Sequence, residues 1–361
     1  MEHPIKRVIS SNHIIDLLRN ISTKCLAIKP DDQFIRLTLN NRVLTEMQAN
    51  IYRRDPSMSS TTDAELFTMK RASVFGWAGL KTSLNFFRWT RKTSMLELCK
   101  QALIAAESKS LLVTLSAMRS ILEITGNCCL LRRDLERFTD PIDNILEKMN
   151  WLNGIDEIID SRIAGMRSDY SKILANGLRS SKKTSYKSGE FEVNLEAKDL
   201  LNGVDLLAES VKGARAAYDF FSEFAHPNLA SSLINYDQTS VRYAIDEIIF
   251  YSVQYEQNKF GDAFLENFGA VLIEGIEIIS ECIDEMVKID DYLNHKADEV
   301  ALVAKRVIRD TIKKDPFAFD AHESCPCYSR KNIQNCCGKL INTSKFGNWP
   351  MVRANNAGLM H

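Results

Sequence analysis

Proline is scarce in this chain, and that scarcity constrains its fold more than any other feature of the sequence. The 361 residues include 8 prolines and 15 glycines, and no proline falls between Asp63 and Phe138. Because proline lacks a backbone donor and breaks a helix interior, a stretch without it can continue as helix over many turns. Apolar residues also recur at the three- and four-residue spacing of a helix face. The sequence therefore predicts an all-α multi-helix bundle.

Helical patterns cover most of the chain, with breaks at proline, glycine and polar runs. The expected helices are 13–28, 63–138 as two or three helices with breaks near Thr90 and Ser108, 142–151, 155–174, 197–225, 241–255, 263–287 and 290–314. The stretch 111–131 is apolar on most of its circumference, so it is predicted to be a central helix. No strand is predicted outside the cysteine-rich segment near the C-terminus.

The overall composition is that of an ordinary globular protein. A formal net charge of −1 gives no global attraction to nucleic acid or to an anionic membrane. The most apolar window, 268–283, is interrupted by Glu274, Glu277 and Glu281, so it predicts an amphipathic helix and no membrane span. Residues 1–20 lack the apolar core of a signal peptide, and the protein is expected in the cytoplasm.

Four of the 9 cysteines lie close together near the C-terminus, in the sequence CPCYSRKNIQNCCGK at 325–339. In a reducing compartment such a cluster binds a metal more often than it forms disulfides, and Zn²⁺ prefers four thiolates at tetrahedral corners. Pro326 would stiffen the first turn, residues 331–336 would form about two turns of helix, and Gly338 would end it. The segment is therefore predicted to fold around one Zn²⁺ ion, with a reduced, metal-free cluster as the alternative.

The same fifteen residues resemble the SEC-C motif, the zinc-binding tail of the SecA translocation ATPase and of many otherwise unrelated bacterial proteins. The resemblance implies that the metal ligands are Cys325, Cys327, Cys336 and Cys337. It also implies that this small zinc knuckle docks on a protein partner or on the ribosome.

A second group of polar residues lies on apolar helices. Arg119 and Glu123 are one turn apart on the predicted central helix, and Tyr218, Ser222 and His226 share one face of a later helix. Because a buried charge needs a partner, we expect Arg119, Glu123 and His226 to lie within contact distance. Such a cluster would either fix the register of the two helices or perform acid–base chemistry on a phosphodiester.

The pattern of this second group loosely resembles uncharacterised bacterial helical families and the HEPN ribonucleases, which are helical bundles from toxin and phage-defence systems. Their motif places an arginine four to six residues before a histidine on one helix, whereas no arginine precedes His226 between Phe220 and Ala225. The sequence contains neither a nucleotide-binding loop nor an acidic metal cluster, so an enzyme of this kind would be a metal-independent ribonuclease.

These observations predict four regions: N-terminal helices over 1–62, a helical bundle domain over 63–316, a linker with the zinc knuckle over 317–339, and a flexible basic tail over 340–361. No acidic residue follows Glu323, so the C-terminal part carries net positive charge even with a zinc–thiolate centre. The favoured function is a zinc-binding interaction protein of bacterial type that docks through the knuckle on a protein partner or the ribosome. RNA is a further candidate partner, an oligomer is compatible with the sequence, and the alternative function is a HEPN-like ribonuclease or phage-defence effector using Arg119 and His226.

Overall fold

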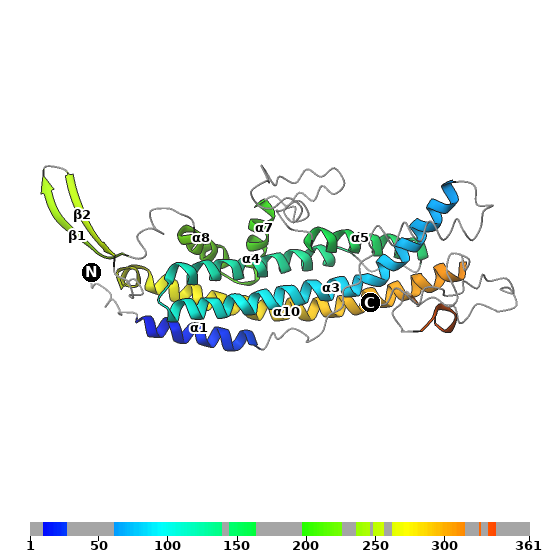
Figure 1. Cartoon of the computed structure of the whole chain (residues 1–361), viewed down its shortest axis with the longest axis horizontal. Coiled ribbons are helices and arrows are strands. Elements are labelled where there is room, and N and C mark those ends of the chain that lie inside the picture. The colour runs from blue at the N-terminus through cyan, green and yellow to red at the C-terminus, as the bar shows by residue number, and fades with distance from the viewer. Residues whose placement is uncertain are drawn as a thin grey trace, which may run out of the picture. The chain divides into compact units, whose positions relative to one another are not determined.

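The computed structural model of the protein describes residues 10–26, 61–138, 144–163, 197–225, 236–245, 248–255, 262–314, 325 and 331–336. In chain order the elements are α1 (Ser11–Leu26), α3 (Thr61–Glu107), α4 (Leu111–Glu136), α5 (Ile145–Ile163), α7 (Ala197–Ser210), α8 (Ala214–Ala225), β1 (Tyr236–Ile245), β2 (Ile248–Tyr255), α10 (Asp262–Lys314) and a 3-10 turn, η2 (Ile333–Asn335) (Figure 1). Apart from one two-stranded ribbon, all regular secondary structure in these ranges is helical. This confirms the predicted class for the described part of the chain.

Two of the helices are longer than the sequence predicted. Helix α3 has 47 residues and continues through Thr90, and α10 has 53 residues and continues through the predicted break after Val287. The predicted break near Ser108 is correct, because α3 ends at Glu107 and Lys109 takes a left-handed φ of 59°. Tertiary burial explains the continuity, since buried apolar residues recur across each of the two predicted breaks.

Helix α5 also continues where a break was predicted, between Trp151 and Ile155. Leu152 and Ile155 are both fully buried, so the apolar face runs on through this point. The predicted helix 155–174 can be followed only to Ile163, because 164–174 lie outside the described residues.

The segment 197–225, predicted as one helix, forms two. Helix α7 ends at Ser210 and α8 begins at Ala214, with Gly213 between them at a φ of +88°. Only glycine adopts this left-handed conformation without strain. A Cβ at this position would also lie 2.9 Å from the Ile278 Cδ1 atom of α10. Gly213 therefore both turns the chain and lets the turn pack closely on α10.

The prediction of a helix over 241–255 is wrong, because 241–245 and 248–255 belong to the two strands of an antiparallel ribbon. Strand β1 pairs with β2 from Tyr236 opposite Tyr255 to Ile245 opposite Ile248. β-Branched and aromatic residues are abundant in both strands, and they favour extended backbone over helix. The apolar spacing alone did not distinguish the two conformations.

The chain forms two compact units, each assembled from separate stretches of sequence. Unit 1 comprises 1–32, 88–134 and 162–292, and unit 2 comprises 33–87, 135–161 and 293–361. Helices α3, α4, α5 and α10 each contribute residues to both units. None of the described helices is both long and apolar enough to cross a lipid bilayer.

Helix α4 lies at the centre of unit 1, as its sequence predicted. Leu111, Leu115, Met118 and Leu122 along its main apolar stripe are all almost fully buried. Figure 1 shows α4 beside α8, and hydrogen bonds between the two helices place them in contact. The centre of the unit thus carries the polar residues that the sequence singled out.

A buried ion pair joins α3 to α10 in the same unit. The guanidinium of Arg88 donates from Nε and Nη2 to the two carboxylate oxygens of Asp290 at 2.8 and 3.0 Å, and Lys92 Nζ donates to Oδ2 at 3.1 Å. Burial alone would raise the pKa of Asp290, but the hydrogen bond and charge of Arg88, together with Lys92, hold it below its ordinary value. Asp290 therefore ties two helices together where the sequence predicted the start of a new helix.

Candidate functional site

Arg119, Glu123 and Tyr218 form a closed polar cluster between α4 and α8. The Arg119 Nη2 atom lies 3.1 Å from Glu123 Oε1 and donates a hydrogen bond to Tyr218 Oη at 3.4 Å. The Tyr218 hydroxyl in turn donates to Glu123 Oε1 at 3.2 Å. Each of the three side chains therefore contacts both of the others.

The cluster is partly shielded from water, which strengthens its interactions. The side chains of Arg119 and Glu123 are 25% and 23% exposed, and Tyr218 is buried. The Arg119 Cζ atom lies 5.5 Å from the centroid of the Tyr218 ring, within the range of a cation–π contact. Burial alone would lower the pKa of the Arg119 guanidinium, but the hydrogen bond to Tyr218 and the charge of Glu123 raise it above its ordinary value.

Three polar atoms in and beside this cluster are buried without a hydrogen-bond partner among the described residues. They are Arg119 Nε, Asn127 Oδ1 and Ser222 Oγ. Asn127 lies one turn after Glu123 on α4, and Ser222 lies one turn after Tyr218 on α8. A buried polar atom with no partner is uncommon in native proteins, so these three positions mark the part of the α4–α8 contact whose polar groups the described residues leave unsatisfied.

The structure brings together some of the residues singled out from the sequence. Arg119 and Glu123 are in contact, as their spacing of four residues on one helix predicted. His226 lies outside the described residues. The sequence placed Tyr218 on the facing helix but did not identify it as the link between Arg119 and Glu123. Its spacing of four residues from Ser222 was the available signal, because it assigns both hydroxyls to one helix face.

The three side chains of the described cluster pair with one another, and this limits the reactions that they could catalyse. One positive and one negative charge cancel, and the Tyr218 hydroxyl both accepts from Arg119 and donates to Glu123. A group that transfers protons must be able to reach the substrate atom directly or through a water. The cluster is therefore better suited to fixing α8 on α4 than to proton transfer by these three groups alone.

A backbone hydrogen bond links two described parts of the cysteine-rich segment. The Cys325 N–H donates to the Lys331 carbonyl at 2.8 Å, so these two residues lie side by side. Asn332 caps η2, and its side chain accepts a hydrogen bond from the Asn335 N–H at 3.2 Å. Residues 333–335 form a single 3-10 turn, shorter than the predicted helix of about two turns.

Cys325 and Cys336 flank this turn in different surroundings. Cys325 is 3% exposed, and Ile333 inside the turn is fully buried. Cys336 is partly exposed and donates its N–H to the Ile333 carbonyl at 3.1 Å. The other two predicted ligands, Cys327 and Cys337, lie outside the described residues. Within the described ranges no three His, Cys, Asp or Glu side chains come together in a metal-binding arrangement.

Comparisons with protein-family models, with curated proteins and with solved structures found no match to this chain.

Proposed function

We propose that the protein is a zinc-binding helical interaction protein of the cytoplasm, whose C-terminal knuckle docks on a partner macromolecule. The observation that supports this proposal is the backbone hydrogen bond from Cys325 to Lys331, together with the capped 3-10 turn that leads from Asn332 to Cys336. Two of the four candidate thiol ligands thus belong to one short segment held by backbone hydrogen bonds. A core of this size needs no disulfide for its stability, which also favours metal over disulfide.

The residues present fit a zinc ion in their donor chemistry. Cys325 and Cys336 from the described turn, together with Cys327 and Cys337 from the sequence, supply the four sulfur donors of a structural zinc site. A thiol in an apolar site resists ionisation, and a bound divalent cation offsets that cost. The ion would cross-link the segment and replace the hydrophobic core that so few residues cannot form.

The charge of the segment indicates the kind of surface that it would contact. The side chain of Lys331 is exposed beside the turn, and Arg330, Lys339, Lys345 and Arg353 add further positive charge with no acidic residue after Glu323. Clustered positive charge on a small module favours an acidic protein surface or the phosphates of ribosomal RNA. A protein partner or the ribosome therefore remains the proposed target.

One observation favours the alternative, a metal-independent ribonuclease or phage-defence effector. Arg119 Nε and Ser222 Oγ are buried without a hydrogen-bond partner among the described residues, and both are donors of the kind that bind phosphate oxygens. In this alternative His226 acts as the general acid or base. The closed pairing of Arg119, Glu123 and Tyr218 gives it less support than the interaction proposal.

The decisive experiment compares what co-purifies with the intact full-length protein and with a Cys336→Ser variant from a bacterial lysate. We expect one Zn²⁺ per chain and a specific set of bound proteins that is lost in Cys336→Ser and at high salt. Cys282→Ser is the matched control, because this cysteine is buried in α10, distant in sequence from the knuckle. An unchanged set of partners in Cys336→Ser would refute docking through the knuckle. RNA cleavage that disappears in a folded His226→Ala variant would establish the ribonuclease instead.

A further inference from the structure

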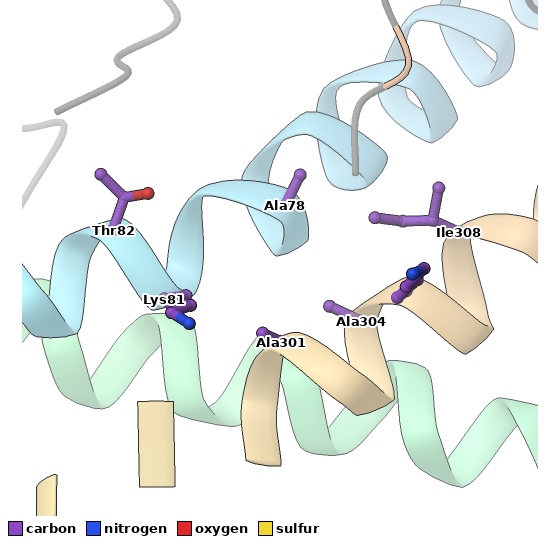
Figure 2. A pocket seen from close by; sticks show the side chains of 7 residues that line it. Ala78, Lys81, Thr82, Ala301, Ala304 and Ile308 are labelled. Carbon is purple, nitrogen blue, oxygen red and sulfur yellow. The ribbon is translucent and has the colours of Figure 1, made fainter. Parts of the chain in front are cut away.

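Unit 2 contains a pocket between α3 and α10 that is separate from both candidate sites. Its volume is about 280 Å³, and it is lined by Ala78, Lys81 and Thr82 from α3 and by Ala301, Ala304, Lys305 and Ile308 from α10. Figure 2 shows the two helices facing each other across this gap, with Ala78 opposite Ile308 and Lys81 near Ala301. The pocket is therefore a groove between two packed helices.

The hollow exists because small residues occupy facing positions. Ala78, Ala301 and Ala304 have no atoms beyond Cβ, so they leave space that a leucine or methionine would fill in an ordinary helix interface. Ala304 and Ile308 are almost fully buried and provide an apolar floor. An apolar group that displaces water from this floor would bury apolar surface and gain van der Waals contacts with the lining atoms.

Two lysines line this hollow, Lys81 from α3 and Lys305 from α10. Lys81 pairs with Asp298 at 2.6 Å, whereas Lys305 is exposed and makes no ion pair with any described residue. Of the two lysines that line the pocket, Lys81 therefore has a described counter-charge and Lys305 has none. Among the described residues, the site thus combines an apolar floor with one lysine, Lys305, that has no ion-pair partner.

We propose that this pocket binds a small monocarboxylate with an aliphatic or aromatic body. The apolar body would occupy the space left by the three alanines, and the carboxylate would pair with Lys305 at the rim. A dianion such as inorganic phosphate would leave the apolar floor uncovered and carry more charge than the rim offsets. An apolar body of about eight carbon atoms fits a volume in which roughly nine waters would otherwise be accommodated.

The proposal can be tested by calorimetric titration of the full-length protein with sodium octanoate. We expect a dissociation constant of about 1 mM or tighter, which is reasonable for a ligand of this size. The uncharged analogue 1-octanol and the variant Lys305→Glu should each bind about ten-fold more weakly. Arg306→Glu is the matched control, because Arg306 is exposed on the same helix but does not line the pocket.

A second variant tests the apolar part of the site. Ala301→Leu places a larger side chain in the hollow at a half-buried position, and it should abolish octanoate binding while circular dichroism shows the helices intact. Leu302→Met, at an exposed neighbouring position, should bind as the natural protein does. The proposal fails if octanoate shows no binding at about 5 mM, several times that expected constant. Binding that is equal for 1-octanol, or unchanged in a folded Ala301→Leu variant, also overturns it.

Discussion

Gly126 of α4 and Gly203 of α7 meet backbone to backbone. A Cβ atom built on Gly126 would lie 2.7 Å from the Gly203 carbonyl carbon, and one built on Gly203 would lie 2.8 Å from the corresponding atom of Gly126. Neither contact could be relieved by moving a flexible side chain, because main-chain atoms are on both sides. The crossing of these two helices in unit 1 therefore depends on the absence of side chains at both positions.

The first prediction follows from this crossing. Gly126→Ala should lower the free energy of unfolding by about 1–3 kcal/mol, because the helices must move apart. Gly79→Ala in α3 is the matched control, since a Cβ there meets nothing within 4 Å. The control should raise stability by about 0.5–1 kcal/mol through helix propensity alone. Urea unfolding followed by circular dichroism measures both, and a neutral Gly126→Ala would show that the crossing adapts easily.

The second prediction concerns the carboxylate of Asp290, whose side chain is only 13% exposed. Asp290→Asn keeps the shape of the side chain but removes the carboxylate charge that pairs with Arg88 and Lys92. Breaking one partner of a buried ion pair costs about 3–5 kcal/mol. Chemical denaturation at neutral pH should show a loss of this size, whereas Asp298→Asn, at an exposed ion pair with Lys81, should cost about 1 kcal/mol or less. Equal losses in the two variants would contradict this interpretation of burial.

The third prediction is the pH dependence of the same pair. Because the folded-state pKa of Asp290 lies below its ordinary value of 3.8, its ionised form stabilises the fold at every pH above that value. This contribution is lost as the pH falls through the lower folded pKa. The stability difference between the natural protein and Asp290→Asn should therefore be constant above about pH 5 and shrink below pH 3.8. A difference that grows on acidification would have the opposite sign and would exclude the mechanism.

The fourth prediction addresses the cluster between α4 and α8. Tyr218→Phe removes the hydroxyl that bridges Arg119 and Glu123, and it should cost about 1 kcal/mol of stability. Combining it with Glu123→Gln in a double-mutant cycle should give a coupling energy of at least about 0.5 kcal/mol. Strict additivity of the two changes would mean that the hydroxyl and the carboxylate do not act together.

The fifth prediction concerns metal removal. Cys336→Ser should release Zn²⁺ and unfold the cysteine-rich segment, while far-ultraviolet circular dichroism changes little, because the described helices have an extensive core of their own. Metal analysis by mass spectrometry provides the direct readout. A global loss of helix in this variant would show that the segment is an integral part of the helical core.

Local sequence predicted where helices exist better than where they end. The buried apolar face of α4 was predictable from the spacing of its apolar residues. The end of α3 at Glu107 was predictable from the polar residues that follow it. The continuation of α10 past Val287 was not, since Asp290 is a typical helix-starting residue whose carboxylate is instead held by Arg88 of another helix. Distant packing partners of this kind are invisible in a local pattern.

The candidate cluster was only partly predictable, because one of its contacts depends on distant packing. Arg119 and Glu123 lie one turn apart on a single helix, and helix geometry alone brings them together. The position of Tyr218 between them depends on how α8 lies on α4, and that follows from the left-handed turn at Gly213 and the packing of Phe221 against Gly275. Neither requirement can be read from residue spacing within α8.

The burial of the cysteines in the helical body has a practical consequence for chemical labelling. Cys25, Cys99, Cys128, Cys129 and Cys282 are all buried, and burial raises the pKa of both Cys128 and Cys129 to about 12. Maleimide reagents react with exposed thiolates, so these five side chains should not be labelled in the folded protein. Alkylation before and after addition of a chelator would then report on the C-terminal cysteines alone. The native protein thus carries its own low-background assay for whether a metal protects them.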